Sequence, residues 1–213
     1  MKYDLKLVKK YIHIPIDDES MNEEIDTIAQ ELKSYVNLNH YYQVFKLEHN
    51  PLSIEGINID TEILNKYFYY SDSVIILVCT LGILVERYLK KMEITDKSKL
   101  LIADAILSSI IETYQDDVIK DLSDNYPGYY LTRGFAPGYP GLDINFQKEI
   151  FRLLNIDKRL GINLTEDFIM IPRKSSSVLV GISKQKSTYQ LACLNCNLKD
   201  DCTIRKNGNH CGK

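Results

Sequence analysis

"SVIILVCTLGILV", the stretch from Ser73 to Val85, decides the fold of this chain. Its first eight residues are almost continuously apolar, a pattern typical of a strand that is buried on both faces. Gly82 then permits a turn or close packing, and a helix is predicted over residues 83–92. The apolar run has only 13 residues, too few to cross a bilayer as a helix, so it predicts a core strand.

The segments on either side of this stretch define the fold class. Residues 41–48 alternate and are rich in aromatic and β-branched side chains, and "SSVLVGIS", residues 176–183, is a second apolar strand candidate. Residues 95–124 carry a wide apolar stripe at helical spacing, with Thr95 or Asp96 as the N-cap. Further helices are predicted over 19–35 (capped by Ser20), 61–67 and 145–154. The opening residues 3–14 contain strand-like stretches but remain ambiguous. Strict βαβ alternation is missing, which predicts an α+β fold with helices packed on a twisted, largely antiparallel sheet.

Composition narrows the function classes. The 213 residues are 45% hydrophobic and 26% charged, as expected for a soluble globular protein. A net charge of −3 without a basic field argues against nucleic-acid binding. The N-terminal residues are charged throughout and lack the apolar core of a signal peptide, so we expect a cytoplasmic protein without membrane association.

The loop "TRGFAPGYPGLD", Thr132–Asp143, is the strongest candidate for a binding site. Pro137 and Pro140 restrict the backbone, and Gly138 allows a positive φ or a close approach. Such a stiff loop loses little entropy when a ligand binds, and it can hold backbone polar groups in fixed positions. Arg133 offers a planar guanidinium suited to a carboxylate. A tight connection with an exposed arginine explains the same residues without a ligand.

The motif "APGYP", with an arginine just upstream, resembles the activation domain of cobalamin-dependent methionine synthase. "FQKEIFRLLNIDKRLGINLTEDFIMIPRKSSSV" is similar to the following segment of that family, and "VCTLGILVERYLKK" and "LLIADAILSSIIETYQDDV" are similar to its stand-alone members. The resemblance extends over about residues 74–183. It implies an activation-domain unit over residues 1–190, followed by a cysteine-rich tail over 191–213.

The resemblance also implies a ligand and a set of site residues. In this family the loop binds S-adenosylmethionine. The implied residues are Arg133 for the methionyl carboxylate; Ala136, Gly138, Tyr139 and Tyr189 around the cofactor; and Glu112 and Tyr139 beside the reacting groups. One departure concerns the spacing, because four residues separate Arg133 from Gly138 where the family commonly has three. The direction of the Arg133 side chain therefore stays open.

The chemistry implied by the resemblance is the reductive methylation of inactive cobalamin. The cobalamin is expected on a separate partner, either a methionine synthase or a related corrinoid protein. The electron is expected from a donor such as flavodoxin or ferredoxin. The chain itself has to align a sulfonium methyl group and exclude water, which requires proximity and orientation and no strong acid or base.

The cysteines suggest an alternative function. Cys79 lies in the apolar run and is expected in the core, whereas Cys193, Cys196, Cys202 and Cys211 have the spacing C-x2-C-x5-C-x8-C. Four thiolates can hold zinc or an iron–sulfur cluster, although reduced, unliganded thiols fit the sequence equally well. A metal cluster would favour a redox adaptor or electron carrier. A third hypothesis is that the chain is a docking subunit for a corrinoid methyltransferase and binds no ligand of its own.

Two further groups of residues can be interpreted either as structural or as functional. Seven tyrosines (Tyr67, Tyr69, Tyr70, Tyr126, Tyr129, Tyr130 and Tyr139) are expected mainly in the core or sheet, with a corrinoid-binding face as the alternative. Arg173 and Lys174 are expected in a solvated turn, with contact to corrinoid side chains or a phosphate as the alternative.

Overall fold

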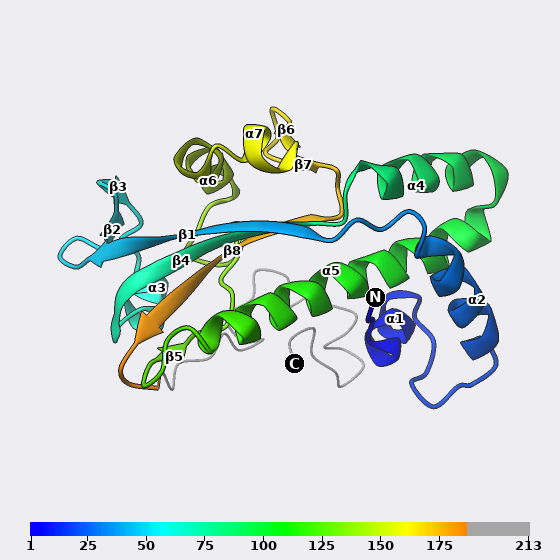
Figure 1. The fold of residues 1–213 in the computed structure, drawn as a ribbon, viewed down its shortest axis with the longest axis horizontal. Coiled ribbons are helices and arrows are strands. Elements are labelled where there is room, and N and C mark those ends of the chain that lie inside the picture. Colours follow the sequence, from blue (N-terminus) through cyan, green and yellow to red (C-terminus); the bar gives the residue numbers. More distant parts are fainter. Residues whose placement is uncertain (187–213) are drawn as a thin grey trace.

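A six-stranded sheet forms the centre of the computed structural model, which describes residues 1–186 (Figure 1). Its strand order is β3-β2-β1-β4-β8-β5, and every pairing is antiparallel. The strands are β1 (Asn39–Glu48), β2 (Ser53–Ile54), β3 (Ile57–Asn58), β4 (Ser71–Thr80), β5 (Tyr130–Leu131) and β8 (Ser175–Ser183). The long strands β1, β4 and β8 therefore lie together, with short pieces at both edges.

Strand β4 is central because it has apolar side chains on both faces. Val74, Ile76 and Val78 point into one cluster of buried residues, and their neighbours Ile75, Leu77 and Cys79 point into another. The stretch that begins at Ser73 is therefore buried on both sides, as its continuous apolar run predicts. Cys79 is fully buried, which confirms its assignment to the core.

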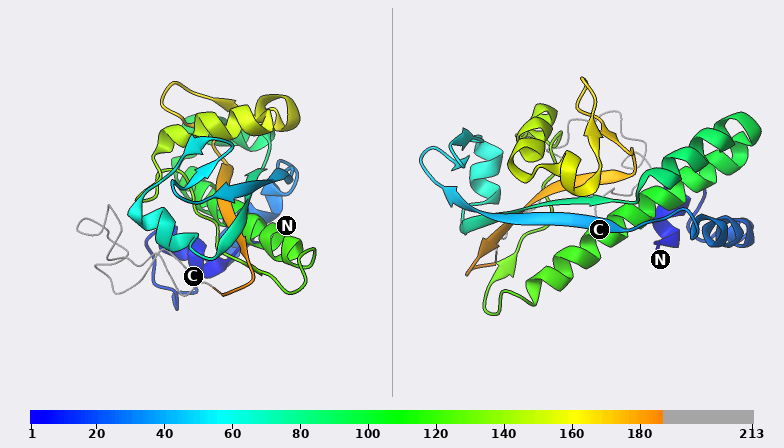
Figure 2. Two further views of the ribbon diagram at one scale, coloured as in Figure 1. Left: turned by 90° about the vertical axis from the view of Figure 1, so that its left-hand side faces the viewer. Right: turned by 45° about the horizontal axis from the view of Figure 1, so that its top comes forward.

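The cluster that contains Ile75, Leu77 and Cys79, which we call the α5-side cluster, lies under the long helix α5 (Lys97–Ser123). Asp96 caps this helix by accepting a hydrogen bond from the Lys99 amide at 3.0 Å. The helices α1 (Leu5–Tyr11), α2 (Asn22–Leu32) and α4 (Ile83–Thr95) complete the same side. Figure 2 shows that α5 and α1 lie on the opposite side of the sheet from α6 and α7.

The cluster that contains Val74, Ile76 and Val78, which we call the α6-side cluster, is assembled from short elements. These are α3 (Glu62–Tyr67), a 3-10 turn (Ile144–Phe146), α6 (Gln147–Leu154) and α7 (Ile156–Leu160). A separate two-stranded sheet, β6 (Asn163–Leu164) with β7 (Met170–Ile171), follows α7. Phe135 and Leu142, both from the candidate loop, are buried in this cluster.

The predicted α+β class with a largely antiparallel sheet is confirmed, one ambiguous segment is resolved, and one local prediction is wrong. The ambiguous opening segment forms helix α1, which Asp4 caps through the amides of Lys6 and Leu7. Ser20 does not cap α2; its own amide donates to Asp18 at 2.9 Å, and the helix begins at Asn22 without a side-chain cap. Asp18, two residues before Ser20, therefore organises the turn that precedes α2.

The helices of the described region also bear on the question of a membrane. Among residues 1–186, no helix is both long enough and apolar enough to cross a bilayer.

Candidate functional site

The first half of the candidate loop is fixed to the edge of the sheet. Beyond β5 the chain continues along β8: the Thr132 amide donates to Gly181 at 3.0 Å, and the Gly181 amide donates to Thr132 Oγ1 at 2.9 Å. Phe135 then exchanges two backbone hydrogen bonds with Leu179, at 2.8 and 2.9 Å. Gly134 lies so close to β8 that a Cβ there would stand 2.9 Å from the Val178 side chain. Glycine is therefore required at this position because the Val178 side chain occupies the space that a Cβ would need.

The second half of the loop is a compact turn that satisfies its own amides. The Gly138 amide donates to Leu142 at 2.8 Å, the Tyr139 amide to Ala136 at 3.1 Å, and the Leu142 amide to Tyr139 at 3.0 Å. Gly138 has a φ of 93° and Gly141 a φ of 92°, conformations that side chains disfavour. The amides of Gly138 and Tyr139 thus stabilise the shape of the turn.

Tyr67 of α3 supports the loop from below. Its hydroxyl donates to the Arg133 carbonyl at 2.8 Å, and its ring packs edge-on against Phe135 with centroids 4.9 Å apart. Only 5% of the Tyr67 surface is exposed, and this burial raises the pKa of its hydroxyl to about 12. The hydroxyl therefore keeps its proton, and this hydrogen bond, at neutral pH. Thr61 adds a second support by donating to the Gly141 carbonyl at 3.1 Å.

The loop residues predicted to contact a ligand lie at the surface above these supports. Arg133 and Gly138 are exposed, Tyr139 is 47% exposed, and Ala136 is half-buried. The ring of Tyr139 packs on Phe135 with centroids 5.6 Å apart. Four predicted site residues thus share one loop whose underside is buried and whose upper side is accessible.

Glu112 lies on a different element, near the middle of α5. The hydroxyl of Tyr11, the last residue of α1, donates a hydrogen bond to its Oε1. Ile111, the neighbour of Glu112, is buried in the α5-side cluster, and both Tyr11 and Ala136 pack against that same cluster. The structure therefore places Glu112 and Ala136 on the same side of the sheet.

The predicted residues near the C-terminus cannot be placed. Tyr189 and the four clustered cysteines, Cys193, Cys196, Cys202 and Cys211, lie outside the described residues. Within residues 1–186, no three His, Cys, Asp or Glu side chains are arranged so that they could hold a metal ion.

The prediction of a solvated turn holds for Arg173, whose side chain is exposed, but is wrong for Lys174. The amide and the Nε of Arg173 donate to the buried carboxylate of Glu86, at 3.0 and 2.9 Å. Lys174 is buried, with its Nζ 2.8 Å from both Asp104 Oδ1 and Ser108 Oγ. Both cations therefore join the start of β8 to helices α4 and α5.

The assignment of the tyrosines to the core is wrong for most of them. Tyr67 is buried and Tyr126 packs against the α5-side cluster. The exposed ones are Tyr69, Tyr70, Tyr129, Tyr130 and Tyr139. They lie in a turn before β4, at the edge strand β5 and on the loop.

Sequence reasoning missed two tyrosines that support the candidate site, Tyr11 and Tyr67. Each makes its contact with a residue that is distant in sequence, Glu112 and Arg133 respectively. No local sequence pattern predicts a contact between residues so far apart.

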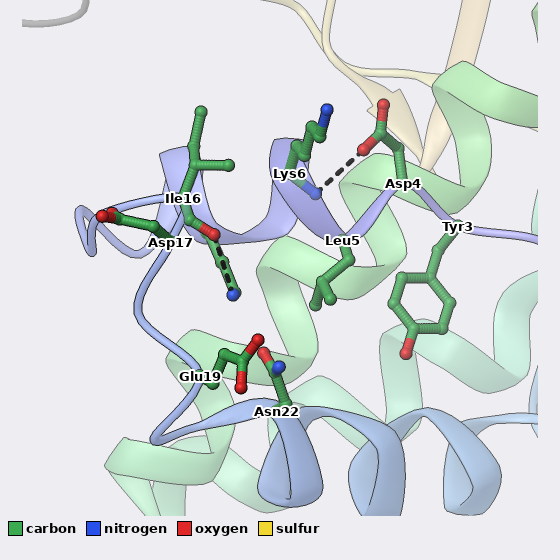
Figure 3. Close-up of a pocket in the computed structure, with 9 residues that line it drawn as sticks. Tyr3, Asp4, Leu5, Lys6, Ile16, Asp17, Glu19 and Asn22 are labelled. Carbon is green, nitrogen blue, oxygen red and sulfur yellow. Dashed lines mark hydrogen bonds between the residues drawn. The ribbon is translucent and has the colours of Figure 1, made fainter.

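A separate cavity lies beside α1 (Figure 3). It has a volume of about 660 Å³ and is lined by residues of α1, of the α1–α2 linker and of the start of α2. In Figure 3, Glu19 and Asn22 lie next to each other on its floor. None of its lining residues belongs to the loop 132–143, so it is distinct from the candidate site.

Comparisons with known proteins agree with the geometry. The model of the family "vitamin B12 dependent methionine synthase, activation domain" matches residues 63–207. Among solved structures, the MetH reactivation domain bound to AdoHcy has a similar fold, with a TM-score of 0.64 at 15% sequence identity. The alignment covers 97% of this chain and 82% of that one. No curated protein sequence matches the chain.

The structural likeness, at 15% identity, shows a shared fold. The family match is stronger evidence, because residues 63–207 make up more than half of the chain and contain the loop, β4, α5 and β8. This chain therefore belongs to the family of activation domains of vitamin B12-dependent methionine synthases.

Proposed function

We propose that this protein binds S-adenosylmethionine at the loop 132–143 and acts as the reactivation component of a cobalamin-dependent methionine synthase or related corrinoid methyltransferase in the cytoplasm. One observation carries the proposal: in a chain of this family, the loop is anchored from beneath by Tyr67 and Phe135 and presents Arg133, Gly138 and Tyr139 at its surface. The likeness to the MetH reactivation domain, which binds AdoHcy in its crystal structure, adds support.

The loop residues fit the parts of this ligand. A guanidinium at Arg133 suits the methionyl carboxylate, for which it can donate two parallel hydrogen bonds. At Gly138 an added Cβ would meet only Ile144 Cδ1, at 3.5 Å, so the backbone is open to a flat nucleoside. The exposed ring of Tyr139 offers a stacking surface to an adenine or a sulfonium.

The contribution of the chain to the reaction would be positioning. Cobalamin, carried by a separate partner and reduced by a donor such as flavodoxin or ferredoxin, would supply the nucleophile that accepts the methyl group. The loop would hold the sulfonium methyl in line with that nucleophile, and the rigid turn would limit the entropy lost on binding. Glu112, as a carboxylate on the same side of the sheet as Ala136, would attract the cationic part of the ligand.

Calorimetry of S-adenosylmethionine binding tests the proposal. We expect Arg133→Ala to weaken binding at least about ten-fold, because a charge-assisted hydrogen bond is worth roughly 1.5–3 kcal/mol. Arg152→Ala is the matched control, since Arg152 is an exposed arginine of α6 whose Nε lies 2.8 Å from Glu149. Absence of binding by the unmodified protein, or equal affinity in both variants, would count against the loop as the binding site.

A second proposal concerns the C-terminal segment, residues 191–213, which we treat as a unit separate from the domain over 1–190. Its C-x2-C-x5-C-x8-C spacing favours a four-thiolate site for zinc or an iron–sulfur cluster. Metal and sulfide analysis of protein purified without oxygen should find about one zinc, or iron together with sulfide, per chain. If the purified protein contains neither zinc nor iron under these conditions, the redox-adaptor hypothesis is refuted.

A further inference from the structure

We propose that Tyr11 is a positioning residue for Glu112, so that helix α1 completes the ligand site from outside the segment that the family model matches. The inference rests on the proposed function, because it assumes that Glu112 faces the bound ligand. Tyr11 lies before residue 63, where the family match begins. The matched segment therefore holds Glu112 without the group that orients it.

The start of α1 is attached firmly to α5. The Asp4 amide donates to Ser109 Oγ at 2.8 Å, and Ser109 Oγ lies 3.2 Å from the Asp4 carbonyl, to which it donates in turn. Ser109 is fully buried, one turn before Glu112 on the same helix. Buried hydrogen bonds of this kind fix one element on another, because water cannot replace them at no cost.

The end of α1 is fixed by Lys9. Its side chain is buried, and its Nζ donates to the carbonyls of Ile16 at 3.0 Å and Asp18 at 2.6 Å. Figure 3 draws the first of these bonds beside the cavity, where the linker folds back along the helix. A buried ammonium needs such partners, so this contact holds both the linker and the last turn of α1 in place. Tyr11 lies in that last turn.

The hydrogen bond from Tyr11 restricts the orientation of the Glu112 carboxylate. Both residues are half-buried, and a glutamate side chain free of contacts would lose rotamer entropy when a ligand binds. A carboxylate keeps its negative charge when it accepts a hydrogen bond, so a Glu112 held by the phenol hydroxyl of Tyr11 still attracts a cation. S-adenosylmethionine offers two positive groups to such a carboxylate, a sulfonium and an ammonium. The proposed role of Tyr11 is to hold the acceptor where one of them arrives.

The test compares Tyr11→Phe with Tyr3→Phe. Both variants remove one phenol hydroxyl next to α1, and both hydroxyls donate to a carboxylate: Tyr11 to Glu112, and Tyr3 to Asp26 of α2. We expect Tyr11→Phe to weaken S-adenosylmethionine binding about ten-fold, the loss of a hydrogen bond to a charged group, with Tyr3→Phe unchanged. Equal affinities of the two variants would overturn the inference.

A double-mutant cycle separates positioning from a general structural role. If Tyr11 acts through Glu112, Tyr11→Phe should have no further effect on affinity in a Glu112→Gln background. A persisting ten-fold loss in that background would show that Tyr11 only holds α1 in place. Melting temperatures of all variants identify any that fail to fold. Absence of binding by the unmodified protein would refute the proposed function, whereas binding that is indifferent to Tyr11 would refute this inference alone.

Discussion

The two faces of the sheet are covered in different ways. On one face a long helix of 27 residues, α5, lies along the strands and buries a continuous apolar stripe, with α1, α2 and α4 packed on the same side. On the other face the covering is assembled from α3, α6, α7 and two residues of the candidate loop, Phe135 and Leu142. The first covering depends on a long periodic pattern, and the second on turns that bring short pieces together.

The candidate loop is where these two coverings meet. Phe135 is buried in the α6-side cluster, and the next residue, Ala136, packs against the α5-side cluster. The loop is therefore anchored by one face, while two of the residues expected to meet the ligand, Ala136 and Glu112, lie on the other. The comparison teaches that the loop is held mainly from one side of the sheet and that its proposed ligand site draws on both.

The largest expected effect comes from removing the anchor. Phe135 is fully buried, so Phe135→Ala should lower the free energy of unfolding by about 4 kcal/mol and abolish S-adenosylmethionine binding. Leu107→Ala removes a fully buried side chain from the α5-side cluster and should cost a similar amount, about 3 kcal/mol, with binding retained below the melting temperature. Urea unfolding and calorimetry measure the two quantities. Loss of binding in both variants would contradict the division between anchoring and ligand-facing sides.

A smaller effect is expected from alkaline pH, and it differs between the two clusters. Burial raises the pKa of Cys79, in the α5-side cluster, from 9.0 to about 12, and that of Tyr67, in the α6-side cluster, from 10.0 to about 12. Because the folded state holds each proton more tightly, the stability from Cys79 is complete below pH 9 and is lost as the pH rises toward 12. The stability from Tyr67 is complete below pH 10 and is lost as the pH rises from 10 toward 12.

Cys79→Ala separates the two contributions. Between pH 9 and 10 the unmodified protein should lose about 1 kcal/mol of unfolding free energy relative to Cys79→Ala, since one pKa unit corresponds to about 1.4 kcal/mol. Tyr67→Phe should keep this early loss and show a shallower decline above pH 10. Urea unfolding at half-unit pH intervals measures both slopes. Parallel curves for the unmodified protein and Cys79→Ala would show that Cys79 ionises equally well when folded.

Much of the fold could be predicted because its main elements follow periodic patterns. The apolar run from Ser73 and the stripe along residues 95–124 gave strand β4 and helix α5 with boundaries within two residues. The loop was identifiable because prolines and glycines in that density constrain the backbone whatever surrounds them.

The remaining features depend on contacts between distant segments. Lys174 resembles a solvated cation in sequence, and only the approach of α5 gives it Asp104 and Ser108 as partners. In the same way, nothing near Tyr11 or Tyr67 in sequence indicates Glu112 or Arg133. The exposed tyrosines show the converse, because Tyr69 is 69% exposed although its sequence surroundings are aromatic and apolar.

The most direct test of the central claim is a residue-resolved NMR titration of the labelled protein with S-adenosylmethionine. The loop and Glu112 of α5 should respond together, so amide shifts are expected at Arg133, Gly138, Tyr139 and Glu112. Leu107, buried on α5 away from the surface, should stay unchanged. Shifts confined to residues outside the loop, or no shifts at saturating ligand, would contradict the assignment of this loop as the S-adenosylmethionine site.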